Sequence, residues 1–203
     1  MNDPSSLPSE HLALVRSLQG FYLQHDDPMR QSGFGGGALR WRAEREPILD
    51  AVEDDGDLLD IGCANGYLLE SLVTWGAERG LALTPYGVDI GEQLITLARR
   101  RLPQFADHFF VGNGWDWQPP HPFRYVYALY DCVPLDYLPT YARRLLDTIV
   151  APGGRLIVGA YGSRSRQEAP LDVAIVLQSA DLTVVGQSAG GSPIHARFAW
   201  IDR

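Results

Sequence analysis

The chain has two cysteines, no lysine and no long apolar run in its 203 residues. Two cysteines without C-x-x-C spacing exclude a disulfide framework and a zinc ribbon. Because all 17 basic residues are arginine, Schiff-base and P-loop lysine chemistry is excluded within this chain. We interpret the missing lysine as the codon bias of a GC-rich genome. No apolar stretch approaches the roughly 20 residues of a membrane span.

The charge balance is acidic, with a formal net charge of −8. A surface that neutralises phosphates normally has the opposite sign, so we expect no nucleic-acid partner. The N-terminus has neither the basic nor the apolar region of a secretory signal. The five histidines lack metal-ligand spacing, which favours no metal site. We therefore expect a soluble cytoplasmic protein that contacts no membrane, with its oligomeric state open.

Strands and helices alternate along most of the chain, which predicts right-handed crossovers and a doubly wound α/β fold. We expect one domain over 1–203, made of an N-terminal helical cap (1–54) and a core (55–203). The last two strands follow each other without a helix and should pair antiparallel. The cap should contain a helix that starts after the N-cap Ser9 and carries an apolar stripe at Leu14, Leu18, Phe21 and Tyr22, and a second helix over 38–52. The predicted strands are 57–61, 84–89, 108–111, 124–130, 155–160, 183–187 and 196–201, and the predicted helices of the core are 66–78, 92–102, 138–150 and 167–180.

Ligands of open parallel sheets bind beyond the carboxyl ends of the strands. Four segments at such ends are richer in Gly, Asp or Asn than the strands before them: 60–66, 87–90, 112–117 and 129–134. Their convergence on one edge of the sheet predicts a single ligand site there.

The first of these segments turns from a strand into a helix through Gly62 and Gly66. A dinucleotide fingerprint, G-x-G-x-x-G, would need glycine where Ala64 and Tyr67 stand. Asp60 would also repel a pyrophosphate, whereas it suits a ligand that carries an ammonium group and a sulfonium. The segment therefore disfavours a nicotinamide cofactor.

The second and third segments can bind a nucleoside. Asp89 can accept hydrogen bonds from both ribose hydroxyls. The Asn113 amide carbonyl can accept from the exocyclic amine of adenine, and a backbone N–H of Gly114 or Trp115 can reach a ring nitrogen. Trp115 or Ile90 can pack on the ring face.

Four runs together carry a resemblance to a known family: DLLDIGCANGYLLE (57–70), GVDIGEQL (87–94), VGNGWDW (111–117) and IVAPGGRLIVG (149–159). In order and spacing, over residues 55 to 203, they resemble the class I S-adenosylmethionine-dependent methyltransferases. The resemblance implies S-adenosyl-L-methionine as the cofactor and a seven-stranded sheet of order 3-2-1-4-5-7-6 with the seventh strand antiparallel.

The family's binding roles carry over residue by residue. The chain departs from the pattern at Asn113, where the family usually has Asp, and at Ala64, where it has a further glycine. The resemblance implies that Asp60 and the loop Gly62, Cys63, Ala64, Asn65 and Gly66 hold the methionine moiety, Asp89 the ribose, and Asn113 with Gly114 the adenine; we add Ile90, Trp115 and Tyr130 to the cofactor-binding set.

Methyl transfer by in-line displacement needs alignment and exclusion of water more than a catalytic triad. For a hydroxyl acceptor we expect a general base among Asp131, His25 and Tyr22. The glycine-rich stretch 21–41 should form a lid. We expect a small-molecule methyl acceptor. A non-catalytic or partner-dependent module, an aminopropyl transferase and a nicotinamide oxidoreductase remain as alternatives.

Overall fold

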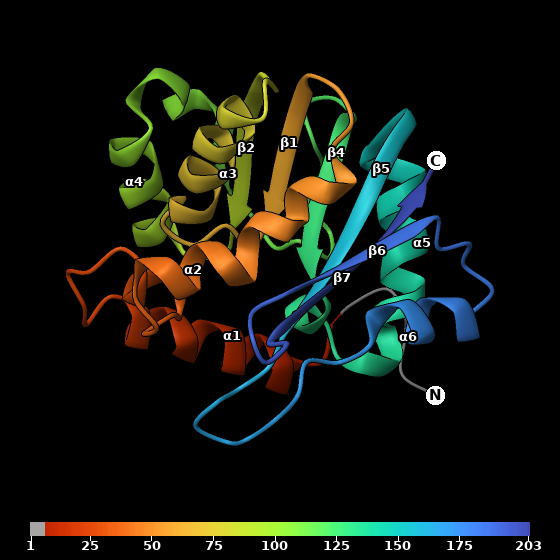
Figure 1. Ribbon diagram of the computed structural model, residues 1–203. Coiled ribbons are helices and arrows are strands. Elements are labelled where there is room, and N and C mark those ends of the chain that lie inside the picture. The colour runs from red at the N-terminus through yellow and green to blue at the C-terminus, as the bar shows by residue number, and fades with distance from the viewer. Residues whose placement is uncertain (1–6) are drawn as a thin grey trace.

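The computed structural model describes residues 7–203, so residues 1–6 of the cap predicted over 1–54 lie outside it. Seven strands form one sheet of order β3-β2-β1-β4-β5-β7-β6 (Figure 1). β7 is antiparallel to both β5 and β6, and the other pairs are parallel, so the predicted order is confirmed. The strands are β1 (Gly56–Ile61), β2 (Leu83–Asp89), β3 (Phe109–Val111), β4 (Phe123–Leu129), β5 (Val150–Tyr161), β6 (Gly186–Gly190) and β7 (Ala196–Asp202).

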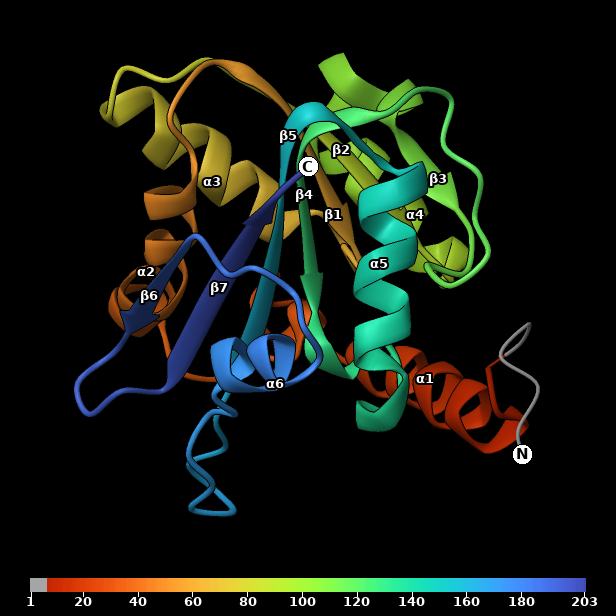
Figure 2. The ribbon, with the colours of Figure 1, turned by 90° about the vertical axis from the view of Figure 1, so that its right-hand side faces the viewer.

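Helices cover both faces of the sheet, and one further helix lies across the carboxyl ends of its strands. α2, α3 and α4 pack on one face and α5 and α6 on the other, whereas α1 lies across the carboxyl ends of the strands (Figures 1 and 2). No helix of residues 7–203 is long and apolar enough to cross a membrane. The helices are α1 (Ser9–Tyr22), α2 (Ala38–Arg45), α3 (Tyr67–Glu78), α4 (Glu92–Arg101), α5 (Leu138–Thr148) and α6 (Val173–Ser179).

Two predicted helices are shorter than the sequence pattern indicated. α2 ends at Arg45 and the chain continues as a 3₁₀ helix (Glu46–Ala51), because Pro47 cannot donate the α-helical hydrogen bond. The helix predicted over 167–180 begins only at Val173. Gln167 has a left-handed φ of 55°, which no α-helix accommodates, and the Asp172 side chain caps the shorter helix.

Two predicted strands also have different bounds. The strand predicted over 183–187 lies at β6, because its register is set by pairing with β7. The strand predicted over 155–160 begins earlier, at Val150, which pairs with Phe123. An irregularity in the pairing with β4 absorbs the turn at Gly153, whose φ is 72°.

The central strands are apolar because both of their sides are covered. Leu58 and Leu59 of β1 face opposite sides of the sheet and are both fully buried. A parallel strand between two helical layers reads as a continuous apolar run for this reason. The polar residues that interrupt these runs lie at the carboxyl ends of the strands, which places the site beneath α1.

Candidate functional site

A cavity lies between α1 and the carboxyl ends of the parallel strands. Its volume is about 70 Å³, well below the roughly 300 Å³ of a small-molecule pocket. A nucleoside-sized ligand can therefore enter only when α1 moves. The walls are Leu7, His11, Leu12 and Val15 from the α1 side, Ile61, Gly62, Val88, Asp89 and Ile90 at the ends of β1 and β2, Gly112, Asn113 and Gly114 after β3, and Cys132 after β4.

The loop after β1 has the backbone conformation that its glycines permit. Gly62 and Gly66 have φ values of 85° and 74°, and Ala64 between them has a φ of 46°. The left-handed region favours glycine, which explains why the family prefers it where Ala64 stands. Gly66 also lets α3 approach α4, because a Cβ there would lie 3.0 Å from the Cβ of Ala98.

Asp89 joins the ends of β1 and β2. Its Oδ2 accepts a hydrogen bond from the Ala64 N–H at 2.9 Å, and its Oδ1 accepts one from Gly91 at 2.8 Å. Burial raises the pKa of Asp89, and these two hydrogen bonds lower it. The carboxylate is thus fixed at the cavity wall, and each oxygen keeps a second acceptor position for a ligand.

The loop after β3 folds on itself. The Asn113 side chain accepts a hydrogen bond from the Trp115 N–H at 3.1 Å, so this N–H is already engaged within the loop. The Trp115 ring is buried and stacks on Tyr141 of α5, with ring centroids 5.9 Å apart. Of the two residues predicted on the adenine face, Ile90 lines the cavity and Trp115 lies in the core.

Asp60 lies beneath the glycine loop, Cys63 belongs to that loop, and neither side chain lines the cavity. Burial, followed by the nearby Asp89, raises the pKa of Asp60 to about 8. Asp60 also contributes to the raised pKa of Tyr127, which lies on the α2 side of the sheet. Cys63 is buried against β2, where a Cβ on Gly87 would come 2.6 Å from its sulfur.

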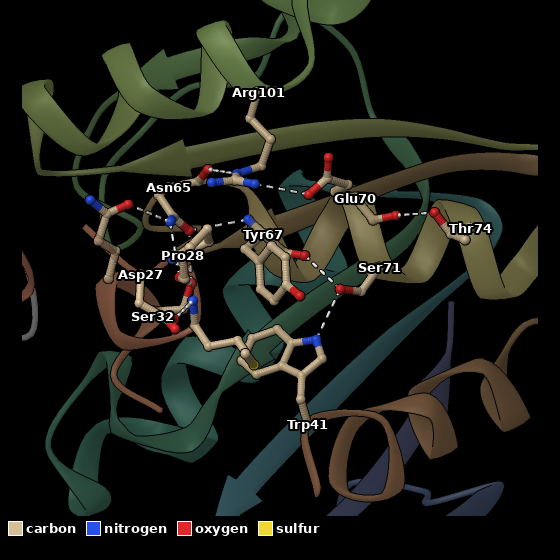
Figure 3. Close-up of polar contacts among 12 residues, drawn as sticks. Asp27, Pro28, Ser32, Trp41, Asn65, Tyr67, Glu70, Ser71, Thr74 and Arg101 are labelled. Atoms are coloured by element: carbon tan, nitrogen blue, oxygen red, sulfur yellow. Dashed lines mark hydrogen bonds and ion pairs between the residues drawn. The ribbon is translucent and has the colours of Figure 1, made fainter. Parts of the chain in front are cut away.

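Asn65 connects the glycine loop to the segment 27–33 of the predicted lid (Figure 3). Its amide nitrogen donates to the Pro28 carbonyl at 3.0 Å and to Gln31 Oε1 at 2.9 Å. Its amide oxygen accepts from the Ser32 hydroxyl at 2.7 Å and from the Tyr67 N–H at 3.2 Å. All four hydrogen-bonding positions of this buried side chain are therefore used within the protein.

The predicted general bases separate into a pair and an outlier. Burial raises the pKa of Tyr22, and Asp131 and Asp89 raise it further, so both carboxyls lie near its hydroxyl, although neither Tyr22 nor Asp131 lines the cavity. Asp131 remains accessible to water, while the surrounding protein raises the pKa of its carboxyl by desolvation. His25 instead packs edge-on against Phe21, with ring centroids 5.3 Å apart, and does not line the cavity.

His11 and Tyr130 lie differently from what the predicted set of site residues implies. His11 lines the cavity, and its Nε2 lies 3.0 Å from the Cys132 carbonyl oxygen. Eleven residues make about three helical turns, so the spacing from His11 to Tyr22 could have placed both on one face of α1. Tyr130, predicted to bind the cofactor, lies outside the cavity lining, where Glu168 contributes to its raised pKa.

Sequence comparison with family models and with curated proteins gave no match. Similarity appears among solved structures. A 1,6-didemethyltoxoflavin-N1-methyltransferase from Burkholderia thailandensis, solved with its substrate and S-adenosylhomocysteine, has a TM-score of 0.65 at 17% identity, with 100% of this chain and 93% of that chain covered. A SAM-dependent methyltransferase from Aquifex aeolicus has a TM-score of 0.57 at 15% identity, covering 100% and 99%. The DhpI–SAH complex gives 0.59 at 18% identity, covering 94% and 96%.

This chain has the class I S-adenosylmethionine-dependent methyltransferase fold. The strand order and the antiparallel β7 agree with it. One further similar structure is a complex of the Haloferax volcanii Trm112 methyltransferase activator with a putative methyltransferase, with a TM-score of 0.60 at 12% identity over 97% of both chains.

Proposed function

We propose that the protein is a methyltransferase that transfers the methyl group of S-adenosylmethionine to a small-molecule acceptor. The observation that carries the proposal is the position of Asp89. Its carboxylate fixes the glycine loop through Ala64 and stands at the wall of the cavity that Asn113 and Gly114 complete. An acidic acceptor at this strand end suits a ribose, and Asp60 at the end of β1 would repel a pyrophosphate.

The residues around the cavity fit this cofactor. The free acceptor positions of Asp89 would bind the ribose hydroxyls, while Ile90 and Gly114 would form an apolar slot for the adenine ring. Asp60, beneath the loop, would become ionised when an ammonium group lies nearby, because an opposite charge offsets the burial that now raises the pKa of its carboxyl. When bound, the cofactor supplies a methyl group activated by its sulfonium.

The protein would then align the two substrates, exclude water from the site and supply a proton acceptor. α1 covers the cavity through Leu12 and Val15 and excludes water. For a hydroxyl acceptor, Asp131 would take the proton that the acceptor oxygen loses as it gains the methyl group. The raised pKa of Asp131 makes its carboxylate a stronger base than an aspartate with the ordinary pKa. Tyr22, whose pKa is raised, stays protonated and can donate a hydrogen bond to the acceptor.

Calorimetric titration with S-adenosylhomocysteine tests the cofactor. We expect binding to the wild type and a loss of roughly 10- to 100-fold in Asp89→Ala, as removal of hydrogen bonds to a charged group predicts. Asp116→Ala, at an exposed aspartate in the neighbouring loop, should bind like the wild type. A heat of binding with NAD but none with S-adenosylhomocysteine would contradict the proposal and favour an oxidoreductase.

Screening of phenols, carboxylic acids and amines with the methyl-labelled cofactor then tests turnover. Asp131→Asn should slow methylation of a hydroxyl acceptor by roughly 10²- to 10⁴-fold, the usual contribution of general-base catalysis. Asp136→Asn, at an exposed position nearby, is the matched control. Cofactor binding without turnover of any acceptor, restored by a protein partner, would favour the partner-dependent module.

A further inference from the structure

A buried guanidinium lies at the carboxyl end of the sheet, outside the cofactor cavity. Arg45 of α2 is only 6% exposed. Its Cζ lies 4.2 Å from the ring centroid of Phe34, 4.0 Å from that of Trp41 and 4.4 Å from that of Tyr161. Three aromatic rings thus hold the charge in place and shield it from water.

This guanidinium is incompletely paired. Arg45 Nη1 is buried and has no hydrogen-bond partner. The Glu44 Oε2 lies 3.8 Å away, which is an ionic contact but too long for a hydrogen bond. A buried charged donor without an acceptor is costly and rare in folded proteins, and such a group calls for an explanation.

Glu44 does not fully neutralise Arg45, because two other arginines also contact the Glu44 carboxylate. Its Oε1 accepts hydrogen bonds from Arg40 Nε at 3.1 Å and Nη2 at 3.0 Å, and Arg164 Nη2 lies 3.7 Å from the same oxygen. Three guanidiniums therefore surround one carboxylate, in a chain whose net charge is −8. The local excess of positive charge points to an anionic ligand.

The position of this arginine cluster (Arg40, Arg45 and Arg164 around Glu44) fits a second substrate. Tyr161 ends β5, and Arg164 follows it in the next loop. The cofactor cavity is bounded mainly by the ends of β1, β2 and β3, and none of the cluster residues lines it. The cluster therefore lies at the same end of the sheet as the cofactor cavity, beside it, at the carboxyl end of β5. Phe34 of the lid covers it, flanked by Gly33 and Gly37 with φ values of 74° and 78°.

We propose that Arg45, assisted by Arg164, binds a carboxylate of the methyl acceptor. This inference rests on the proposed function and makes it more specific, because it assigns the acceptor to the organic acids. The planar guanidinium matches a carboxylate in shape and charge. The aromatic walls leave one buried nitrogen free, which suits the planar end of a small acid better than a phosphate with three oxygens. Opening of the lid at Phe34 would admit it.

Benzoate and its neutral counterpart benzamide test the proposal by calorimetry, with and without saturating S-adenosylhomocysteine. We expect the wild type to bind benzoate and not benzamide. Arg45→Gln should weaken benzoate binding by roughly 10- to 100-fold, as expected for loss of a charge-assisted hydrogen bond, and Arg45→Lys should weaken it less. Arg166→Gln, in the same loop but paired with Glu168, should have no effect.

Equal binding of benzoate and benzamide, or unchanged benzoate binding in Arg45→Gln, would overturn the proposal. If Arg45→Gln instead weakened S-adenosylhomocysteine and spared methylthioadenosine, which lacks the amino-acid moiety, Arg45 would bind the cofactor's own carboxylate and the acceptor assignment would be wrong.

Two further measurements separate folding and cofactor effects from the acceptor assignment. Should Arg45→Gln fail to fold, Arg164→Gln, at an exposed arginine, should still weaken benzoate by about two- to fivefold, and no change there would contradict the proposal. Failure of the wild type to bind S-adenosylhomocysteine would refute the proposed function, whereas the benzoate titration without it would still decide whether Arg45 binds carboxylates.

Discussion

The two helices of the cap, α1 and α2, relate to the core in opposite ways. α1 has 14 residues and buries none of them, whereas α2 has eight and buries Trp41, Glu44 and Arg45. α2 packs on the sheet beside α3, while α1 lies across the strand ends and projects from the body of the protein (Figure 2). α2 is thus part of the folded core, and α1 is a cover.

The difference shows that an apolar stripe does not by itself decide which helix face is buried. Leu14, Leu18 and Phe21 of α1 are 57%, 42% and 54% exposed, while the polar His11 of the same helix lines the cavity. A helix held by so little buried surface can open at small cost. This property suits an element that must move before a nucleoside-sized ligand can enter.

The largest expected effect that tests this comparison comes from truncating one aromatic side chain in each helix. Trp41→Ala should lower the free energy of unfolding by about 3–5 kcal/mol, because it removes a buried ring and leaves Ser71 without the indole N–H that it accepts at 2.9 Å. Phe21→Ala, in α1, should change it by less than about 0.5 kcal/mol. Urea denaturation measures both. Equal losses would show that α1 is as much a part of the core as α2.

Two carboxyls of the site differ in burial as the two helices do. Asp60, on the α2 side, is buried, and Asp131, near α1, is accessible to water. A folded-state pKa of about 8 for Asp60 means that the folded protein binds the proton more tightly than the unfolded chain. Stability is then fully present below the unfolded pKa and lost as pH rises toward the folded pKa, by about 1.4 kcal/mol per pH unit. Asp60→Asn should remove this loss of stability at high pH, because asparagine does not ionise.

The stability difference between Asp60→Asn and the wild type should therefore increase by about 2–3 kcal/mol from about pH 5 to about pH 7. Denaturation of the unliganded proteins at both pH values measures it. Asp136→Asn, at an exposed aspartate, is the matched control. A constant difference for Asp60→Asn would mean that Asp60 is ionised in the folded protein at neutral pH.

Asn65 sharpens the comparison within the lid, because it holds segment 27–33 to the glycine loop by three hydrogen bonds, whereas His11 of α1 makes one, with the Cys132 carbonyl. Asn65→Ala should destabilise the protein by about 1–3 kcal/mol, since its partly buried partners lose their hydrogen bonds. Hydrogen exchange of residues 27–33 should accelerate, with exchange in α5 unchanged. Ser32→Ala removes one of the bonds to Asn65 and the bond from the Ser32 hydroxyl to the Pro28 carbonyl, and it should have a smaller effect. Unchanged exchange in Asn65→Ala would show that the lid is held by other contacts.

The sequence predicted the fold well, because strand and helix periods, turn glycines and the four motif runs are local signals. It also predicted which loops meet at the site, since the carboxyl ends of parallel strands share one edge. It could not predict side-chain direction across long separations. Asn65 points to residues more than 30 positions away, and the Trp115 ring turns into the core. Arg45 acquires its aromatic neighbours only when the lid and β5 meet it.

The smallest expected effect concerns the exposed stripe of α1. Leu18→Ser replaces an apolar side chain that is already 42% exposed, so the free energy of unfolding should change by less than about 0.5 kcal/mol. The affinity for S-adenosylhomocysteine should also stay unchanged, because Leu18 does not line the cavity. Val15→Ser, one turn earlier on the cavity side of α1, should weaken that affinity instead. If both variants bind like the wild type, α1 does not cover the bound cofactor; if Leu18→Ser unfolds the protein, the stripe contributes to the core after all.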